Sequence, residues 1–455
     1  MDLVIRGGQL VDGSIADIGI AGETIVQIGG ELSAPNEIDA HGKLLLPGGV
    51  DAHVHLSSPP IERSGPAWVD DFTSGSAAAL AGGITTVGNM TFGAPGESLL
   101  QALERETAVA RRASIADVFL HPVLASPDAD NLAEIARLGS EGCSSMKVFL
   151  TNPHFNRDLD SHIEAIRRAG EAGVVSMLHC EDAATIAFAT RQLVSQGKTS
   201  LRYFGESRPV IAEVVATQRA LAIAELTGAP VYIVHLSSAR ALALCAVARA
   251  RGLHVYVETR PLYLYLTSEW LQRPEAGKFI GQPPLREHSD VDALWTGLRS
   301  GIIDTVCTDH APWSLQAKLD PSHEIEHLRP GVENLQLLLP MLYSEGVRTG
   351  RISLSRLVEL SSSNAAKLFG LYPRKGAIAV GSDDADLVIF DPDLERTVTA
   401  AMLKSNVDYS VYEGWRVTGW PIVTIRRGEI VFRDDHVIGQ AGSGQVLSCG
   451  RGGVL

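Results

Sequence analysis

The sequence has few of the features that mark secreted or membrane proteins. Its 455 residues include only five cysteines, which are widely spaced and form no CxxC pair. An odd, dispersed set excludes a disulfide framework and indicates reduced thiols, so we expect a cytoplasmic protein. The N-terminus lacks the basic region and apolar core of a signal peptide, and no uncharged apolar run reaches membrane-spanning length. We therefore expect no membrane association.

Positive charge is also scarce. The chain has 39 lysines and arginines against 53 acidic residues, a formal net charge of -14. This balance repels nucleic acid and anionic membranes. Hydrophobic residues make up 45% and charged residues 20%, which is ordinary for a globular protein with a substantial core. We expect a small molecule as the partner, not nucleic acid or a membrane.

The two ends of the chain share a sequence pattern that the middle lacks. Residues 1–48 and 375–455 alternate short apolar runs with glycine turns, as in LVIRGG, ADIGIAG and ADLVIFDP. This pattern predicts β-strands, and its recurrence predicts one small β-sandwich domain formed by both ends, with a tail after the last strand. Two unrelated β-caps are the alternative.

The middle, residues 49–374, alternates short apolar strands with alanine-rich helices. This order indicates parallel βαβ units, and eight strands are the number that closes a barrel. We therefore expect an α/β fold built on a (β/α)8 TIM barrel. An open doubly wound sheet is the alternative, disfavoured because no Gly-rich dinucleotide fingerprint follows a strand. The eight expected strands are GGVDAHVHL, GITTVGNM, DVFLHPV, SSMKVFL, VVSMLHC, PVYIVHL, LHVYVET and DTVCTDH.

Potential metal ligands fall at the C-terminal ends of these strands, where a barrel places its active site. Each alone has an ordinary explanation, because a strand-end histidine is often a hydrogen-bonded core residue and a lysine can extend its charge to solvent. Six such groups on one rim predict a metal site. They are His53, His55, Lys147, His179, His235 and Asp309.

Lys147 fits this site only in a modified form. A protonated amine is repelled by divalent cations, whereas a neutral amine can add carbon dioxide to give a carbamate whose two oxygens bridge two metals. In this scheme His53, His55 and Asp309 bind one metal, His179 and His235 bind the other, and Lys147 joins them. Nitrogen and oxygen ligands without thiolate favour zinc, with manganese, cobalt and nickel as alternatives.

Such a site predicts metal-assisted hydrolysis. The metals can acidify an attacking water and polarise an amide carbonyl. Asp309 can take the proton of that water and return it to the leaving nitrogen. The adjacent His310 is a candidate for orienting a ligand from behind.

The motifs DAHVHL, MKVF, HCED, IVHLSS and TDHAP occur in the order found in the cyclic amidohydrolases, which the chain resembles over nearly its whole length. The resemblance implies a barrel with a β-sandwich from both termini, two metals and a homo-oligomer, a dimer or tetramer. DDFTSGSAAALAGGITT and VDYSVYEGWRVTGWPIVTIRRGEIV resemble the hydantoinase and dihydropyrimidinase branch. The activity implied is hydrolysis of a hydantoin or dihydropyrimidine to an N-carbamoyl amino acid.

The substrate-binding positions depart from the pattern of that branch. Asn152 stands where hydantoinases usually place an oxyanion-stabilising tyrosine. Either its amide or the nearby His154 can substitute, or else the metal alone polarises the carbonyl. Gln282 replaces a more usual serine, Arg260 a more usual cysteine, and His327 aligns with a substrate-contacting asparagine. Asn152, Gln282 and His327 are therefore our candidates for substrate binding.

Two other classes of function are the alternatives. Allantoinase or dihydroorotase is the enzymatic alternative, but dihydroorotases usually carry an arginine two residues after the HxH motif, where this chain has Ser57. Without that cation a substrate carboxylate is expensive to bury, unless Arg63 or Arg260 supplies the charge. A barrel that serves as a scaffold or assembly protein is the non-enzymatic alternative, and retention of all six ligands argues against it.

Overall fold

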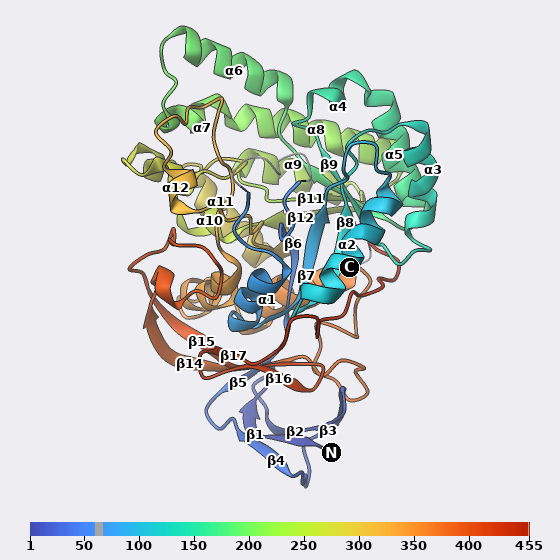
Figure 1. Ribbon diagram of the computed structural model, residues 1–455, viewed down its shortest axis with the longest axis vertical. Helices are drawn as coiled ribbons and strands as arrows, with labels where there is room; N and C mark the ends of the chain where they lie inside the picture. Colours follow the sequence, from blue (N-terminus) through green and yellow to red (C-terminus); the bar gives the residue numbers. More distant parts are fainter. Residues whose placement is uncertain (60–66, 454) are drawn as a thin grey trace.

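A barrel lies above a sheet made by the two chain ends (Figure 1). The computed structural model describes residues 1–59, 67–453 and 455. The barrel occupies the middle of the chain, and the sheet combines the first and last strands. This arrangement determines which end of the barrel is open to a substrate.

Eight parallel strands form the barrel. Three of them pair in the order β6-β7-β8 and five in the order β13-β12-β11-β10-β9. Single bridges from Val123 to Lys147 and from Val54 to His310 join the two groups at both seams. All eight lie where the sequence predicts them, so the barrel is confirmed and the open sheet is wrong. The strands are β6 (Gly49–Val54), β7 (Ile84–Thr91), β8 (Asp117–Pro122), β9 (Ser145–Phe149), β10 (Val175–His179), β11 (Val231–Ile233), β12 (Val255–Thr259) and β13 (Thr305–Val306).

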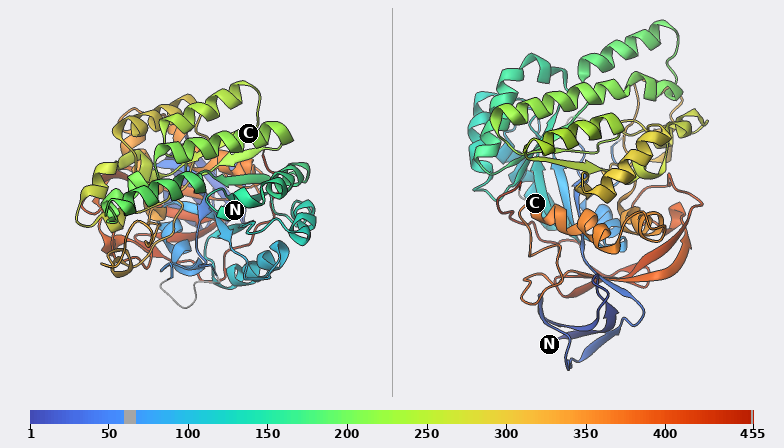
Figure 2. Two further views of the ribbon diagram at one scale, coloured as in Figure 1. Left: turned by 90° about the horizontal axis from the view of Figure 1, so that it is seen from above. Right: turned by 180° about the vertical axis from the view of Figure 1, so that it is seen from behind.

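Helices surround these strands, as the view from above shows (Figure 2). Helix α2 illustrates the local cause: Leu99, Ala102 and Ala110 fall on one buried face, and Ser98 and Gln101 form a capping box at its start. The helices are α1 (Phe72–Ala81), α2 (Leu99–Ala113), α3 (Ala129–Leu138), α4 (Pro153–Arg157), α5 (Leu159–Glu171), α6 (Ala183–Ser195), α7 (Phe204–Ser207), α8 (Val210–Thr227), α9 (Ala239–Ala250), α10 (Pro261–Tyr265), α11 (His288–Ser300), α12 (Leu315–Lys318), α13 (Leu338–Leu342), α14 (Leu354–Val358) and α15 (Asn364–Leu368).

The two chain ends meet in one nine-stranded, mostly antiparallel sheet. Strand β5 is the link, because it pairs with β1 on one side and antiparallel with β14 on the other. Lys43 before β5 also donates to Asp391 in β14 at 2.6 Å. The predicted β-domain from both ends is thus confirmed. Its strands are β1 (Leu3–Gln9), β2 (Ile15–Ala21), β3 (Thr24–Ile28), β4 (Asn36–Asp39), β5 (Leu44–Pro47), β14 (Leu387–Thr397), β15 (Arg416–Arg426), β16 (Glu429–Arg433) and β17 (His436–Val437).

The C-terminal tail closes the barrel at the N-terminal ends of its strands. Val446 bridges Val118 in β8, and the Leu447 amide donates to the Val118 carbonyl at 2.7 Å. Further along, Gly452 donates to Gly173, just before β10, at 2.9 Å. With this end covered, a substrate must enter at the C-terminal ends of the strands.

A buried ion cluster joins the barrel to the terminal sheet. Lys375 lies 2.6 Å from Asp117 at the start of β8 and 2.8 Å from both Asp384 and Asp386, which precede β14. Arg427 in the β15–β16 turn also pairs with Asp117. The three carboxylates raise the pKa of Lys375 despite the opposing effect of burial. The cluster therefore holds the two parts of the molecule in register.

We expect Lys375→Met to destabilise the protein strongly, because three buried carboxylates would lose their shared cation. Breaking a buried ion pair costs about 3–5 kcal/mol. Denaturant unfolding measures the effect, with Lys367→Met as the control. Lys367 lies half-buried on α15 with its ammonium 5.3 Å from the centre of the Tyr372 ring. Equal midpoints for the two variants would show that the cluster does not stabilise the junction.

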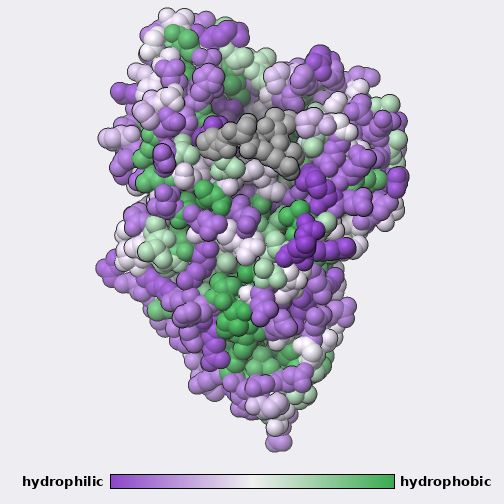
Figure 3. Space-filling view, viewed as in Figure 1, coloured by the Kyte–Doolittle hydropathy of each residue, from purple (hydrophilic) through white to green (hydrophobic). Residues whose placement is uncertain are grey.

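No helix among the described residues combines the length and apolar character needed to cross a bilayer. On the face drawn in Figure 3, hydrophilic residues cover much of the barrel, and apolar residues gather lower, over the terminal sheet.

Candidate active site

The six predicted ligands meet at the C-terminal rim of the barrel. His53 lies in β6, Lys147 in β9 and His179 at the end of β10, while His55, His235 and Asp309 lie just beyond strands β6, β11 and β13. All six line one cavity of about 260 Å³. Their convergence follows from the topology, since parallel strands of a barrel end at one rim.

Three of these side chains form a close cluster. The Asp309 Oδ1 atom lies 3.0 Å from His55 Nε2 and 3.4 Å from His53 Nε2. One donor atom from each of the three lies within 4.8 Å of the others. Two imidazoles and a carboxylate at this spacing match the donor set of a divalent metal.

The remaining three ligands lie beside that cluster. The His179 and His235 rings are 4.5 Å apart between centroids, and His235 is 5.5 Å from His53. The Lys147 Nζ atom lies 3.4 Å from His53 Nε2. The arrangement is thus a group of three, a pair, and a lysine that contacts the first group.

Two of the ligands have strained backbones. His235 has φ of 36° and Asp309 has φ of 50°, in the left-handed region that non-glycine residues seldom adopt. Such strain persists only where the surroundings impose it, and it concentrates at functional sites. The strands stop short of both residues, so the chain turns there and directs the two side chains into the cavity.

Burial shifts the site's bases toward their neutral forms. It lowers the pKa of His53 and His235 well below the usual histidine value, so both imidazoles have lone pairs for a metal. Burial also lowers the pKa of Lys147 to about 8, against the opposing pull of Asp309 and Glu258. A lysine with this pKa has about a tenth of its amines neutral at pH 7, far more than an exposed lysine.

Arg260 pairs with Asp309, which sequence reasoning did not foresee. Its Nη1 atom lies 2.5 Å from Asp309 Oδ2, the oxygen opposite the one near the histidines. Burial alone would raise the pKa of Asp309, but Arg260 and the two histidines hold it well below its usual value. Asp309 is therefore a carboxylate, with one oxygen toward the histidine cluster and the other held by Arg260.

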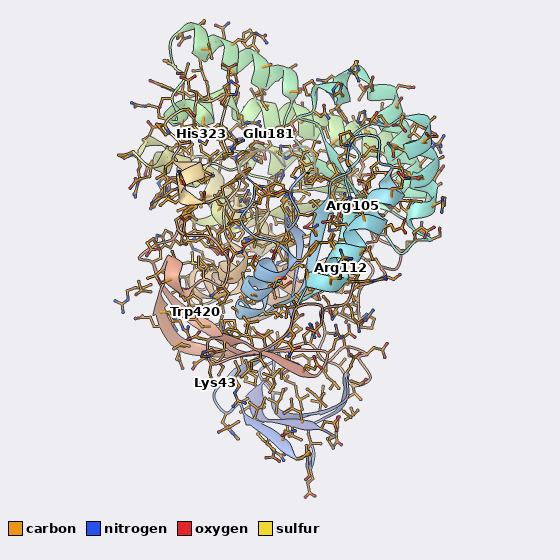
Figure 4. The ribbon with its side chains drawn as sticks, viewed as in Figure 1. Lys43, Arg105, Arg112, Glu181, His323 and Trp420 are labelled. Carbon is orange, nitrogen blue, oxygen red and sulfur yellow. The ribbon has the colours of Figure 1, made fainter. Side chains whose placement is uncertain are left out.

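Buried carboxylates support the histidines from behind. Glu258 in β12 lies 2.8 Å from His53 Nδ1 and accepts from the His235 amide at 2.8 Å, and burial raises its pKa to about 7. Glu181, labelled in the barrel part of Figure 4, lies 3.0 Å from His179 Nε2. Sequence reasoning missed both, although a glutamate within the apolar strand VYVET was a readable signal. Partners of this kind orient metal-binding imidazoles.

Aromatic rings form much of the cavity wall beyond the ligands. Trp68, Phe92, Phe149 and Trp313 line it, and the Trp68 ring lies 4.9 Å from His55 and 6.1 Å from Phe92. Besides Lys147, the basic residue Arg329 lines the cavity, with its guanidinium 5.2 Å from the centre of the Trp313 ring. A flat, mostly uncharged ring with an apolar substituent fits such a wall.

The predicted substrate-binding residues occupy different positions. Gln282 lines the cavity. Asn152 caps helix α4, accepting from the His154 amide at 2.9 Å, and it is not among the described residues that line the cavity. His327 lies in a turn with Glu324, and its neighbours Leu328 and Arg329 line the cavity instead.

Three further residues are possible contributors to the site on the basis of the sequence. Ser57 accepts from the Asn89 amide at 3.1 Å. His310 is fully buried, and its Nε2 atom lies 2.7 Å from Asp70. Arg63 lies outside the described residues.

Comparison with known proteins places this geometry among metal-dependent hydrolases. The sequence matches the family described as "Amidohydrolase family" over residues 44–431. It is 36% identical to a D-hydantoinase of Ralstonia pickettii and 39% identical to a D-phenylhydantoinase of Escherichia coli, in each case over 98% of both chains.

Solved structures agree with the sequence matches. A dihydropyrimidinase from Brevibacillus agri superposes with a TM-score of 0.94 at 37% identity, covering 99% of each chain. An L-hydantoinase from Arthrobacter aurescens superposes with a TM-score of 0.90 at 30% identity, covering 98% of this chain and 99% of its own. Similarity therefore extends to proteins named for either enantiomer.

Proposed function

The chain belongs to the amidohydrolase family and is a cyclic amide hydrolase of the hydantoinase type, and we propose that it opens hydantoin or dihydropyrimidine rings with two divalent metal ions. The observation that carries the proposal is the cluster of His53, His55 and Asp309 beside the pair His179 and His235. The expected product is an N-carbamoyl amino acid. The same retained ligands argue against a scaffold role.

The donor set fits two metals. Buried nitrogen atoms of His55 and His235, both Nδ1, have no hydrogen-bond partner among the described residues, and their rings are neutral. His53, His55 and Asp309 would hold one ion, and His179 and His235 the other. Nitrogen and oxygen donors without thiolate favour zinc, with manganese, cobalt and nickel as alternatives.

Lys147 would complete the site as a carbamate. Its neutral Nζ adds to the carbon of carbon dioxide, one N–H proton leaves to solvent, and the product is an anion with two oxygens. The pKa of about 8 supports this step, because only the neutral amine is nucleophilic. Its Nζ atom lies 3.4 Å from His53 Nε2, and its side chain lines the same cavity as His179 and His235, which supports a bridging role.

The bound metals would supply Lewis acidity, polarising the substrate carbonyl and acidifying the attacking water. Asp309 would take a proton from that water and deliver it to the ring nitrogen as the C–N bond breaks. Arg260 would keep this carboxylate oriented through Oδ2. Gln282 lies in the cavity where it can bind the ring, and we keep Asn152 and His327 as candidate substrate contacts.

We expect neutral hydantoins or dihydropyrimidines to be hydrolysed with a much higher kcat/KM than dihydroorotate. Burying an unpaired carboxylate is costly, and Ser57 stands where dihydroorotases place an arginine. The measurement uses one metal-loaded batch at one pH, before and after a strong chelator, which should abolish turnover. A preference for dihydroorotate would overturn the assignment and implicate Arg329, the arginine in the cavity wall.

The assembly, cellular location and domain boundaries of the protein are also proposals. We propose a homo-oligomer, a dimer or tetramer, supported by apolar side chains exposed on outer helices: Phe188 on α6, Leu226 on α8 and Val247 on α9. A cytoplasmic location is supported by the five free, buried cysteines. The boundaries of the barrel at residues 49 and 374 stay predictions.

A further inference from the structure

Two separate segments that border the active-site cavity converge on one buried lysine, Lys318 at the end of α12. Its ammonium donates to the carbonyls of Ile280, Arg329 and Gly331 at 2.9, 2.8 and 2.9 Å. Residues 280–282 end in Gln282, and residues 329–331 all line the cavity. Lys318 itself is only 1% exposed and is not among the residues that line the cavity.

One further hydrogen bond joins the two segments, and another joins the second segment to Trp313. The Gly331 amide donates to the Ile280 carbonyl at 2.9 Å, and the Trp313 indole donates to the Pro330 carbonyl at 2.8 Å. The backbone of Gly331 has φ of 121°, and a Cβ there would lie 2.2 Å from the Ala311 carbonyl. The carbonyls of 329, 330 and 331 are thus each held by a side chain from residues 313–318.

The number of hydrogen bonds that Lys318 makes is what distinguishes this arrangement. An ammonium has three N–H donors, which equals the number of carbonyls it meets. Among the described residues it pairs with no carboxylate, and burial lowers its pKa well below the usual lysine value. An apolar side chain here would leave the carbonyls of Arg329 and Gly331 without the donor that they share with Ile280, so one nitrogen atom links the two segments.

We infer that Lys318 is a positioning residue for substrate binding, which holds the segments 280–282 and 329–331 at the spacing that the substrate ring requires. It acts through Gln282 and the wall at 329–331 and does not touch the substrate. The inference rests on the proposed function for the identity of the ligand. Because none of the six metal ligands lies in these segments, Lys318 governs the fit of the substrate and not metal binding.

The test compares Lys318→Met with the wild-type enzyme, both metal-loaded. We expect the variant to keep its metal content but to raise KM for a 5-substituted hydantoin about tenfold or more, since displacements near 1 Å at a site can cost about 100-fold. Hydrogen exchange should quicken in peptides that cover 280–283 and 329–331. Unchanged KM and unchanged exchange in the folded variant would overturn the inference.

Two further variants separate positioning from general damage. Lys278→Met removes the same charge from a half-buried site in the segment before Ile280, and it should leave KM and exchange unchanged. Lys318→Arg keeps a cation, so it should fold even if Lys318→Met does not, but a planar guanidinium cannot direct three donors from one atom. We expect Lys318→Arg also to raise KM, and a wild-type KM in that variant would contradict the inference. If the wild-type chain opened no cyclic ureide, the proposed function would fail, while exchange and metal content would still test Lys318.

Discussion

Replacing Lys147 with arginine is expected to leave a folded barrel that loses its metal pair and with it essentially all ring-opening activity. A guanidinium neither adds carbon dioxide nor gives a lone pair to a cation, and it stays charged at all working pH values. Metal analysis of the purified variant, beside turnover of a hydantoin, measures the effect. Two bound metals and near-normal turnover in Lys147→Arg would rule out the carbamate.

The smaller variant Lys147→Ala offers a sharper control. Lys147 is completely buried between His53 and the Phe149 ring, so truncation opens a space of about the size of the lost side chain. A short carboxylic acid such as acetate or propionate can enter that space and supply the two oxygens. We expect either acid, but not an alcohol of equal size, to restore metal content and part of the activity.

Replacing Asp309 with asparagine is expected to reduce kcat by a factor of about 10²–10⁴, the usual effect of removing a positioned acid–base group. An amide keeps an oxygen that can face the metal but has no basic lone pair to accept the proton of water. Steady-state kinetics with metal-saturated enzyme measures the effect. We expect metal content to fall much less than in His53→Ala, which is the matched control.

A second outcome of that experiment is informative. If Asp309→Asn turned over at nearly the wild-type rate, another residue would have to be the base, and His310 is adjacent in the chain. The structure disfavours His310, because its ring is fully buried and its Nε2 atom lies 2.7 Å from Asp70. Adding His310→Ala to Asp309→Asn would decide between the two, since the remaining turnover would be lost if His310 were the base.

The barrel and its metal ligands were predictable because both depend on local, periodic signals. A strand such as SSMKVFL can be predicted from its apolar composition and its length. The position of a strand-end residue such as His179 then follows from the position of its strand. Once eight strands close into a barrel, their last residues must meet at one rim. His53, Lys147 and Asp309, far apart in the sequence, therefore lie together.

Contacts that depend on loop paths were not predictable in the same way. The pairing of Arg260 with Asp309 depends on how the chain turns after β12 and β13, and the aromatic wall around Trp68 and Trp313 depends on two long connections. Asn152 shows the opposite case. Its position before Pro153 is typical of a helix N-cap, so a local rule could have assigned it to α4.

The pairing of β5 with β14 also constrains how the chain is made. Lys43 and Asp391 are 348 positions apart. The edge of β5 therefore cannot pair with β14 until those intervening residues have been synthesised. During that time the first strands present an unpaired, apolar edge that another nascent chain could extend. Yield in cells should therefore depend on translation rate and on chaperones more than the stability of the finished enzyme would suggest. Circular permutation that joins the two ends, making β5 and β14 neighbours in synthesis, should relieve this dependence.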